Sequence, residues 1–421
     1  MNILWITNIL LPEATAILTG NNDLRSTGGW ILGAAESLVT NSIINLSIAS
    51  VSPLVKELTI LKTDRIVYYV LPLGSGNKKY NQEYEQYWVK VKSYATPDIV
   101  HIHGSEFTHG LSYIRACGSK NVILSIQGLR SIIKNYYFQG LSTWDIIKNT
   151  TLHDIVFGGG IYSNFREYNA LSKYEIELIK SVSYIIGRTS WDRANVKAIN
   201  PNIKYFFCNE TLRPEFYEGV KWSSSKCQKH TIFVSQAVNP FKGFHQLLKA
   251  MPIVIRNYPD TKIRVAGFDI SRGNAKFKNL RISGYGKILS HLIEKYELQN
   301  RIIYTGQLNA IQMRNEYLSS NVFVLPSAIE NSPNSLGEAQ ILGVPHIASY
   351  VGGISDMMVH NEHNLYRFEE ISMLAEIICR VFEQPDSEID MSDIAKKRHN
   401  RETNALQLIN IYNSVINDEI L

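Results

Sequence analysis

The chain has little cysteine and no long uninterrupted apolar run. Its four cysteines are widely scattered along 421 residues and show no spacing typical of metal ligands. They therefore indicate free thiols in a reducing compartment. No apolar run reaches the roughly 18 residues that a membrane-spanning helix needs. The apolar start of the chain lacks a basic segment and is interrupted by Pro12 and Glu13, so it predicts a buried strand and not a signal peptide. We expect a cytoplasmic protein.

The chain also has few charged residues. The formal net charge is +5, and only 19% of the residues are charged. This small excess does not favour nucleic-acid binding, which needs clustered basic residues. It would suit contact with an anionic membrane surface or with an acidic acceptor.

Short apolar runs typical of strands alternate with longer segments of helical periodicity, starting at residues 2–7 and restarting near residue 230. This alternation predicts βαβ units and parallel sheets. Residues 214–229 break the rhythm with proline, glycine and serines, as linkers do. We therefore predict an α/β protein with two Rossmann-like domains and a C-terminal helix that packs back toward the first domain. The predicted boundaries are 1–213 for the first domain, 214–229 for the linker, 230–390 for the second domain and 391–421 for the C-terminal helix.

Residues 330–353 combine two glutamates, a predicted helix start and a glycine pair. The helix is expected to begin at Asn334 or Ser335, and either side chain could cap it. The free backbone N–H groups of its first turn would form an anion site. Glu330 and Glu338 would accept hydrogen bonds from hydroxyl groups, because a carboxylate repels phosphate. This order fits a nucleotide sugar, in which a diphosphate separates two sets of hydroxyls.

These motifs resemble the retaining glycosyltransferases of family 4, the glycosyl transferases of group 1, which have the two-domain GT-B fold with a cleft between the domains. The resemblance is carried by the Glu-x7-Glu pair with the G-V-P and V-G-G triplets after it, and by further segments along the chain. These segments are STGGW (26–30), PDIVHIHG (97–104), FKGFHQLLKA (241–250), YTGQL (304–308), VFVLPSAIENSPNSLGEAQ (322–340) and GVPHIASYVGG (343–353).

The resemblance implies roles for residues of the second domain. Glu330 would bind hydroxyls of the transferred sugar and Glu338 those of the ribose. The helix start at Asn334, with the amides of Ser335 and Leu336, would hold the diphosphate. An isolated pair of glutamates is more often a solvated loop acid and a surface helix acid. The surrounding motifs favour the functional interpretation.

Lys242 matches the family lysine that binds the donor diphosphate and stabilises it as it leaves. Two positions depart from the family pattern. Many members carry an arginine five residues before the lysine, where Gln236 or Ala237 stands here, and Arg264 is a candidate replacement. Many members also have a histidine where this chain has Gln127, which can hydrogen-bond a sugar but cannot carry charge.

The first domain offers fewer signals. Gly28 and Gly29 open its first helix and would contact donor and acceptor, or simply form a tight turn. His103 ends a predicted strand, where ligands of α/β sheets bind, while His101 is assigned to the core. Glu106 is the candidate acceptor contact together with Gln127, and a solvated loop acid is an equal alternative for Glu106.

The predicted function is a hexosyl- or N-acetylhexosaminyl-transfer from a nucleotide sugar, with UDP favoured over GDP, to a saccharide or lipid-linked acceptor in bacterial surface-polysaccharide synthesis. No two aspartates are separated by one residue, so the Asp-x-Asp metal bridge is missing and neither metal nor other cofactor is expected. Residues 130–149 resemble a helix lying on a membrane or a core helix with its loop, so peripheral contact with the cytoplasmic membrane stays open. The alternatives are a nucleotide-sugar 2-epimerase and a non-catalytic sugar-binding descendant.

Overall fold

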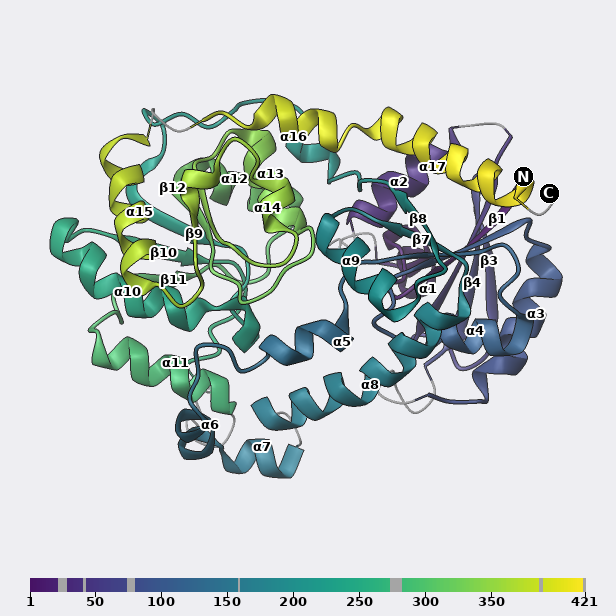
Figure 1. The fold of residues 1–421 in the computed structure, drawn as a ribbon, viewed down its shortest axis with the longest axis horizontal. Coiled ribbons are helices and arrows are strands. Elements are labelled where there is room, and N and C mark those ends of the chain that lie inside the picture. Colours follow the sequence, from purple (N-terminus) through teal and green to yellow (C-terminus); the bar gives the residue numbers. More distant parts are fainter. Residues whose placement is uncertain are drawn as a thin grey trace. The chain divides into compact units, whose positions relative to one another are not determined.

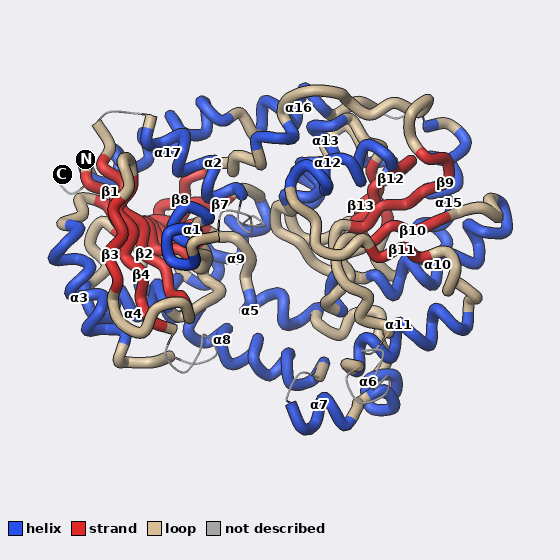
Figure 2. Tube along the Cα trace, turned by 180° about the vertical axis from the view of Figure 1, so that it is seen from behind, coloured by secondary structure: helices blue, strands red, loops and turns tan. Residues whose placement is uncertain are grey.

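The computed structural model describes residues 1–21, 29–40, 43–73, 80–157, 160–272, 282–385 and 389–418. The chain divides into two compact α/β units, each with its own sheet (Figures 1 and 2). Unit 1 contains Met1–Ile132, Tyr168–Arg213 and Arg398–Leu421. Unit 2 contains Ile133–Glu167 and Pro214–Lys397.

Unit 1 is built on an eight-stranded sheet in the order β3-β4-β2-β1-β5-β6-β7-β8. All neighbouring strands are parallel except β3 and β4. Every residue of β5 is buried, which explains its continuous apolar reading, because a parallel strand is covered on both faces. The strands are β1 (Asn2–Thr7), β2 (Asn45–Ser52), β3 (Thr59–Lys62), β4 (Ile66–Pro72), β5 (Ile99–His103), β6 (Val122–Ser125), β7 (Tyr184–Gly187) and β8 (Lys204–Phe207).

Helices cover both faces of this sheet and enclose two apolar cores. Alternate residues of β1 enter different cores, Leu4 and Ile6 one and Ile3 and Trp5 the other, because side chains alternate across a strand. The C-terminal helix α17 packs on α2 and belongs to unit 1, as predicted. The helices are α1 (Pro12–Thr19), α2 (Gly29–Val39), α3 (Tyr84–Ala95), α4 (His109–Cys117), α5 (Arg130–Ile133), α8 (Ile161–Ser181), α9 (Ser190–Ile199) and α17 (Arg401–Asn417). The first residues of α8, up to Glu167, belong to unit 2.

Unit 2 has a six-stranded sheet in the order β11-β10-β9-β12-β13-β14, and all its strand pairs are parallel. Its strands are β9 (Gln228–Val234), β10 (Lys262–Val265), β11 (Ile302–Tyr304), β12 (Ser320–Leu325), β13 (His346–Ser349) and β14 (Leu365–Tyr366). Its main helices are α6 (Thr143–Asn149), α7 (Leu152–Phe157), α10 (Phe244–Asn257), α11 (Gly284–Lys295), α12 (Ala310–Ser319), α13 (Asn334–Leu342), α14 (Ile354–Met357), α15 (Ile371–Glu383) and α16 (Ser392–Arg398).

The strand order reverses once in each unit. In unit 1, β1 lies between β2 and β5, and in unit 2, β9 lies between β10 and β12. Ligands of open α/β sheets bind outside the carboxyl ends of the strands at such a reversal. The loops after β1 and β5, and those after β9 and β12, are therefore where ligand contacts are expected.

The units differ from the predicted domains in three segments. Residues 391–397 were predicted to be part of the C-terminal helix that packs toward the first domain, but they belong to unit 2. Residues 133–167 were predicted to belong to the first domain, but they are part of unit 2. Tyr137, only 1% exposed, packs its ring 5.6 Å from that of Phe241, and Gln139 O lies 3.1 Å from His245 Nε2. The predicted linker 214–229 is also part of unit 2, where Trp222 N–H donates to Leu342 O. Periodicity cannot reveal these assignments, because they depend on contacts between residues distant in sequence.

Candidate functional site

Two chain segments meet at the strand reversal of unit 2. After β9, the short 3₁₀ turn Pro240–Lys242 carries Lys242, and after β12 the loop before α13 carries Glu330. Lys242 Nζ lies 2.6 Å from Glu330 Oε1, and Ser327 Oγ donates to the same oxygen at 2.8 Å. The Lys242 and Glu330 side chains are 20% and 11% exposed. The structure therefore brings together the predicted cation and the first predicted acid, and neither is a freely solvated side chain.

Glycines allow this close approach of loops. Gly243 has φ 70°, and a Cβ there would lie 1.6 Å from Pro326 O. Gly352 has φ 54°, and a Cβ there would lie 1.8 Å from Glu330 O, which accepts a hydrogen bond from Gly353 N–H at 3.0 Å. Side chains do not fit in either place. The glycine pair after β13, Gly352 and Gly353, therefore supports the backbone that carries Glu330.

Helix α13 begins beside Glu330, and its N-terminus is not capped by a side chain. The predicted cap at Asn334 or Ser335 is wrong, because the N-cap position is occupied by Pro333, which has no capping group. Leu336 N–H donates to Pro333 O at 3.0 Å. In the described part of the chain, the N–H groups of Asn334 and Ser335 have no acceptor. This is expected, because the first N–H groups of a helix find no carbonyl partner within the helix. Of the predicted amides, Ser335 therefore has a free N–H, whereas that of Leu336 is engaged within the turn.

Glu338 lies one turn further along α13. It is 5% exposed, and the helix is buried from Leu336 to Leu342. The alternative of a surface helix acid is therefore wrong for Glu338. Unit 2 thus combines the Lys242–Glu330 ion pair with the N-terminus of α13, whose free amides carry partial positive charge.

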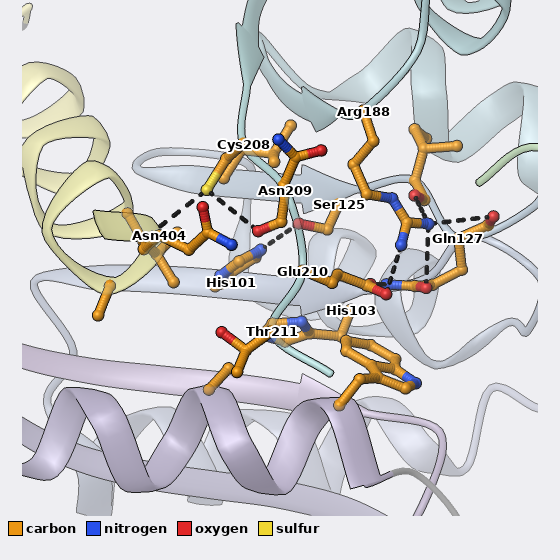
Figure 3. A pocket seen from close by; sticks show the side chains of 16 residues that line it. His101, His103, Ser125, Gln127, Arg188, Cys208, Asn209, Glu210, Thr211 and Asn404 are labelled. Atoms are coloured by element: carbon orange, nitrogen blue, oxygen red, sulfur yellow. Dashed lines mark hydrogen bonds and ion pairs between the residues drawn. The ribbon is translucent and has the colours of Figure 1, made fainter. Parts of the chain in front are cut away.

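Unit 1 places polar side chains at the carboxyl ends of four neighbouring strands, β5, β6, β7 and β8. Figure 3 shows those around one cavity of about 50 Å³, lined among others by His103, Gln127, Arg188 and Glu210. Arg188 forms an ion pair with Glu210, and the two side chains are 5% and 11% exposed. Arg188 also donates to Gln127 Oε1 at 3.2 Å, while Gln127 Nε2 donates to Glu210 Oε1 at 2.5 Å. The guanidinium charge is thus compensated, and the orientation of Gln127 is fixed.

The two histidines of β5 have different environments. His101 uses both ring nitrogens, Nδ1 with Tyr412 Oη at 2.7 Å and Nε2 with Ser125 Oγ at 2.6 Å, as expected for a core histidine. His103 is 5% exposed and neither of its ring nitrogens has a hydrogen-bond partner. Burial lowers the pKa of His103 to about 3. At neutral pH this ring is uncharged, so it can bind a hydroxyl but cannot act as a cation.

Glu106 is held just after β5. Its Oε1 accepts a hydrogen bond from Gly128 N–H at 2.8 Å, whereas Oε2 is buried without a partner. Burial raises the pKa of Glu106 to about 7. Gly104 has φ 94°, and a Cβ there would lie 2.4 Å from Glu106 Oε2 and 2.9 Å from Asn8 Nδ2. The alternative of a solvated loop acid is therefore wrong, and an unsatisfied carboxylate oxygen lies at the strand reversal of unit 1.

Comparison with known proteins finds a family match in the second half of the chain. Residues 221–398 match the family described as glycosyl transferases group 1.

The curated relatives match over limited lengths. The chain is 32% identical over 117 residues to the Bacillus subtilis (strain 168) protein named teichuronic acid biosynthesis glycosyltransferase TuaC, which covers 27% of this chain and 30% of that protein. The chain spans between 30% and 44% of the length of the first three curated relatives that it matches.

Solved structures match over nearly the whole chain. Sucrose-phosphate synthase from Thermosynechococcus elongatus has a TM-score of 0.71 at 15% identity and covers 99% of both chains. Anabaena HepE in complex with UDP and glucose has a TM-score of 0.66 at 13% identity, over 98% of this chain and 100% of that one. These likenesses confirm the predicted GT-B fold.

The departures from the group 1 glycosyltransferase pattern remain in the structure. Gln236 is exposed and Ala237 is buried after β9. Arg264 does not replace the missing family arginine, because it forms two hydrogen bonds with Glu316, at 2.5 and 2.7 Å. Lys242 is therefore the cation that the structure provides next to Glu330.

Other expectations concern the glycines, metals and membrane spans. Gly28 lies outside the described residues, and Gly29 is the first residue of α2. Within the described ranges, no group of three or more His, Cys, Asp or Glu side chains could hold a metal ion. None of the described helices is long and apolar enough to cross a bilayer.

Sequence reasoning missed Arg188 and Glu210. Arg188 directly follows β7, which the sequence indicated as a strand, whereas Glu210 lies three residues after the end of β8. The rule that ligand groups lie at the carboxyl ends of parallel strands, which selected His103, could have selected Arg188 as well. Their pairing could not be found this way, because it depends on the neighbouring places of the two strands in the sheet.

Proposed function

We propose that this chain is a retaining glycosyltransferase that moves a hexosyl or N-acetylhexosaminyl group from a UDP-sugar to a saccharide or lipid-linked acceptor without a metal ion. The observation that carries the proposal is the contact of Lys242 with Glu330 beside the uncapped N-terminus of α13. This arrangement offers positive charge for a diphosphate and a carboxylate for sugar hydroxyls in adjacent positions.

The donor would bind across these groups. The amides of Asn334 and Ser335 and the Lys242 ammonium would hold the diphosphate, since helix N-termini and lysines both bind phosphate. Glu330 uses Oε1 for Lys242 and Ser327, so its Oε2 would receive hydroxyls of the transferred sugar. Glu338 would bind the ribose. The crystal structures of the neighbour HepE with UDP and with UDP-glucose support the choice of a uridine donor.

The charge that develops on the leaving diphosphate would be stabilised by the same groups, and preorganised donors are effective at this task because they need not reorient. Glu330 is tied to Lys242, so it is not a free nucleophile for a covalent intermediate. We therefore propose front-face attack with retention of configuration, in which the departing phosphate accepts the proton of the acceptor hydroxyl.

The acceptor would bind in unit 1. His103 offers two unused ring nitrogens and Glu106 an unused carboxylate oxygen, and Gln127 is oriented next to them. Hydroxyl groups of a saccharide satisfy both donors and acceptors. The naming of the relative TuaC for teichuronic acid biosynthesis supports a role in surface-polysaccharide synthesis, on the cytoplasmic side of the membrane where nucleotide sugars are available.

A thermal-shift and calorimetric screen tests the donor site. The protein is titrated with UDP, GDP and ADP and their common sugars, with and without EDTA. We expect stabilisation by the uridine series that EDTA does not change. Glu338→Ala should lose it, whereas Glu376→Ala, an exposed acid on α15, should retain it. A requirement for a divalent ion, or equal binding by Glu338→Ala, contradicts the proposal.

Product analysis separates the alternatives. Release of UDP with transfer of the sugar to an added glycan supports the transferase. A nucleotide-sugar isomer formed without any acceptor would indicate the 2-epimerase. The missing arginine near Gln236 is the observation that favours a non-catalytic descendant, and retained UDP binding with neither transfer nor donor hydrolysis would establish it.

A further inference from the structure

Arg130 carries a positive charge within unit 1 that no acid of the described chain pairs with. The residue follows β6 as the first residue of α5, and it is only 9% exposed. Its guanidinium carbon lies 5.1 Å from the centre of the Phe107 ring and 4.6 Å from that of the Tyr168 ring. Among the described residues its guanidinium forms no ion pair, and its buried Nε has no hydrogen-bond partner. A buried charge is costly unless it is paired, so an unpaired arginine at this position points to a partner outside the chain.

The two acids nearest to this segment do not supply that partner. Glu175 is buried on α8 and accepts hydrogen bonds from the backbone N–H groups of Arg130 and Ser131, at 3.0 and 2.7 Å. It also accepts one from Ser105 Oγ at 2.9 Å. This carboxylate therefore holds the start of α5 and not the guanidinium. Burial raises the pKa of Glu106 to about 7 against the opposing charge of Arg130, so this second acid is only partly ionised at neutral pH.

A second arginine of unit 1 shows the same stacking with its anion in place. Arg115 lies over the ring of Tyr80, with 4.2 Å between the guanidinium carbon and the ring centre. One of its terminal nitrogens donates to both carboxylate oxygens of Glu177, at 2.6 and 2.8 Å. Stacking on an aromatic ring therefore leaves the N–H groups of a guanidinium available to an anion. Arg130 has two such rings and lacks only the anion.

The surroundings of Arg130 fix the direction in which its guanidinium can bind. Phe107 follows β5, and its ring stacks on that of His109 with a centroid distance of 6.0 Å and an interplanar angle of 9°. Burial lowers the pKa of His109 to about 4, so this ring is uncharged at neutral pH and adds no competing cation. Because Nε is enclosed, the terminal nitrogens are the part of the guanidinium left for a ligand. Their two N–H groups match the two oxygens of a carboxylate or a phosphate.

We propose that Arg130 binds an oxyanion of the acceptor, either a carboxylate or a phosphate group. Phe107 and Arg130 follow the neighbouring strands β5 and β6, at the edge of the sheet where ligands of α/β proteins bind. The stacked rings stabilise the cation before the ligand arrives, so little ordering is needed when the oxyanion binds. Oxyanion binding follows from the geometry of unit 1, and only its assignment to the acceptor rests on the proposed function.

Ligand-observed NMR titration of the full chain tests the proposal without any donor or transfer. Two pairs of probes are compared, methyl glucuronide with methyl glucoside and glycerol 3-phosphate with glycerol. We expect an anionic probe to bind about tenfold or more tightly than its neutral counterpart, and this preference should decrease as the salt concentration rises. Preference for the glucuronide alone identifies a carboxylate, preference for glycerol 3-phosphate alone identifies a phosphate, and preference for both supports a site for either oxyanion.

Variants of the two stacked arginines complete the test. Arg130→Gln should abolish the preference for the anionic probe. Arg130→Lys keeps the charge but not the planar fork, so it should bind that probe more weakly than the wild type and more tightly than Arg130→Gln. The matched control Arg115→Gln removes an arginine that already has its acid, Glu177, and should bind the probes as the wild type does.

Three results would overturn the proposal: no preference for either anionic probe, a preference that Arg130→Gln retains, or an equal loss of preference in Arg115→Gln. Circular dichroism checks the fold of every variant. If Arg130→Gln does not fold, Arg130→Lys decides, and wild-type affinity in that variant contradicts the role of the fork. UDP binding is measured on the same proteins, so a failure of the proposed donor site is distinguished from a failure of oxyanion binding.

Discussion

Replacing Lys242 by alanine tests the central contact of unit 2, because it removes a cation and leaves a carboxylate behind. Lys242 Nζ lies 2.6 Å from Glu330 Oε1, and both side chains are largely buried. Losing a hydrogen bond to a charged group costs about 1.5–3 kcal/mol. An uncompensated carboxylate at about 6 Å from the diphosphate adds about 3 kcal/mol of repulsion at an effective dielectric constant of 20. We therefore expect Lys242→Ala to weaken UDP binding at least about 100-fold.

The second half of this prediction concerns Glu330→Gln. This change removes the negative charge while Lys242 stays, so UDP should bind more tightly than to the wild type even though transfer falls. The double variant Lys242→Ala with Glu330→Gln lacks the repulsion that the single lysine variant suffers, and it should recover about tenfold or more in affinity.

Isothermal titration calorimetry with UDP at fixed ionic strength measures all four proteins of this cycle. Lys262→Ala, which removes an exposed lysine on β10, serves as the matched control and should bind UDP as the wild type does. If the double variant binds UDP no better than Lys242→Ala, or if Glu330→Gln weakens UDP binding, then the Lys242–Glu330 pair does not lie beside the bound diphosphate, and the assignment of this contact to the donor site is refuted.

Three further predictions concern the folded state. Arg188→Met should lower the free energy of unfolding by about 3–5 kcal/mol, because it leaves the buried Glu210 carboxylate without its cation. A double variant that also carries Glu210→Leu should unfold at a higher temperature than Arg188→Met. If the effects of the two single changes on the unfolding free energy simply add in the double variant, the pairing is contradicted. Gly352→Ala should cost about 1–3 kcal/mol or more from its left-handed backbone and the clash with Glu330 O, seen as a lower melting temperature together with weaker UDP binding; an unchanged melting temperature would show that the loop yields. Glu106→Gln should stabilise the protein by up to about 3 kcal/mol at pH 8 and by almost nothing near pH 4. The folded pKa of Glu106, about 7, lies above the usual value of 4.5, so wild-type stability falls as pH rises from 4.5 to 7. A pH-independent difference in denaturant unfolding would disprove this cause.

The sequence predicted the α/β fold because the signals of its strands and of its helices both lie within short segments of the chain. Strands buried on both faces read as apolar runs, and the segments between them show helical periodicity. Glu330, Glu338 and Lys242 could be selected because the segments that carry them, which follow predicted strands or begin a predicted helix, resemble the motifs of group 1 glycosyltransferases. The structure brings Lys242 and Glu330 into contact because β9 and β12 are neighbours at the strand reversal.

Other features depended on contacts that the sequence does not display. The predicted cap at Asn334 or Ser335 was one residue too late, because a helix boundary is set by backbone geometry and Pro333 already occupies the N-cap. Arg264 was a reasonable candidate for the missing phosphate cation, but a strand residue binds whatever the neighbouring helix presents, and α12 presents Glu316.

The sequence by itself determined the class of fold and the order of the elements, because these follow from the pattern of apolar and polar residues within short segments, and its motifs selected the residues of the proposed donor site. Only the tertiary structure decided that residues 133–167 belong to unit 2 and that Glu210 compensates the charge of Arg188. It also decided that both ring nitrogens of His101 have hydrogen-bond partners, whereas those of His103, which is also buried, have none. Burial and pairing are properties of neighbours in space, and residues far apart in the chain supply those neighbours.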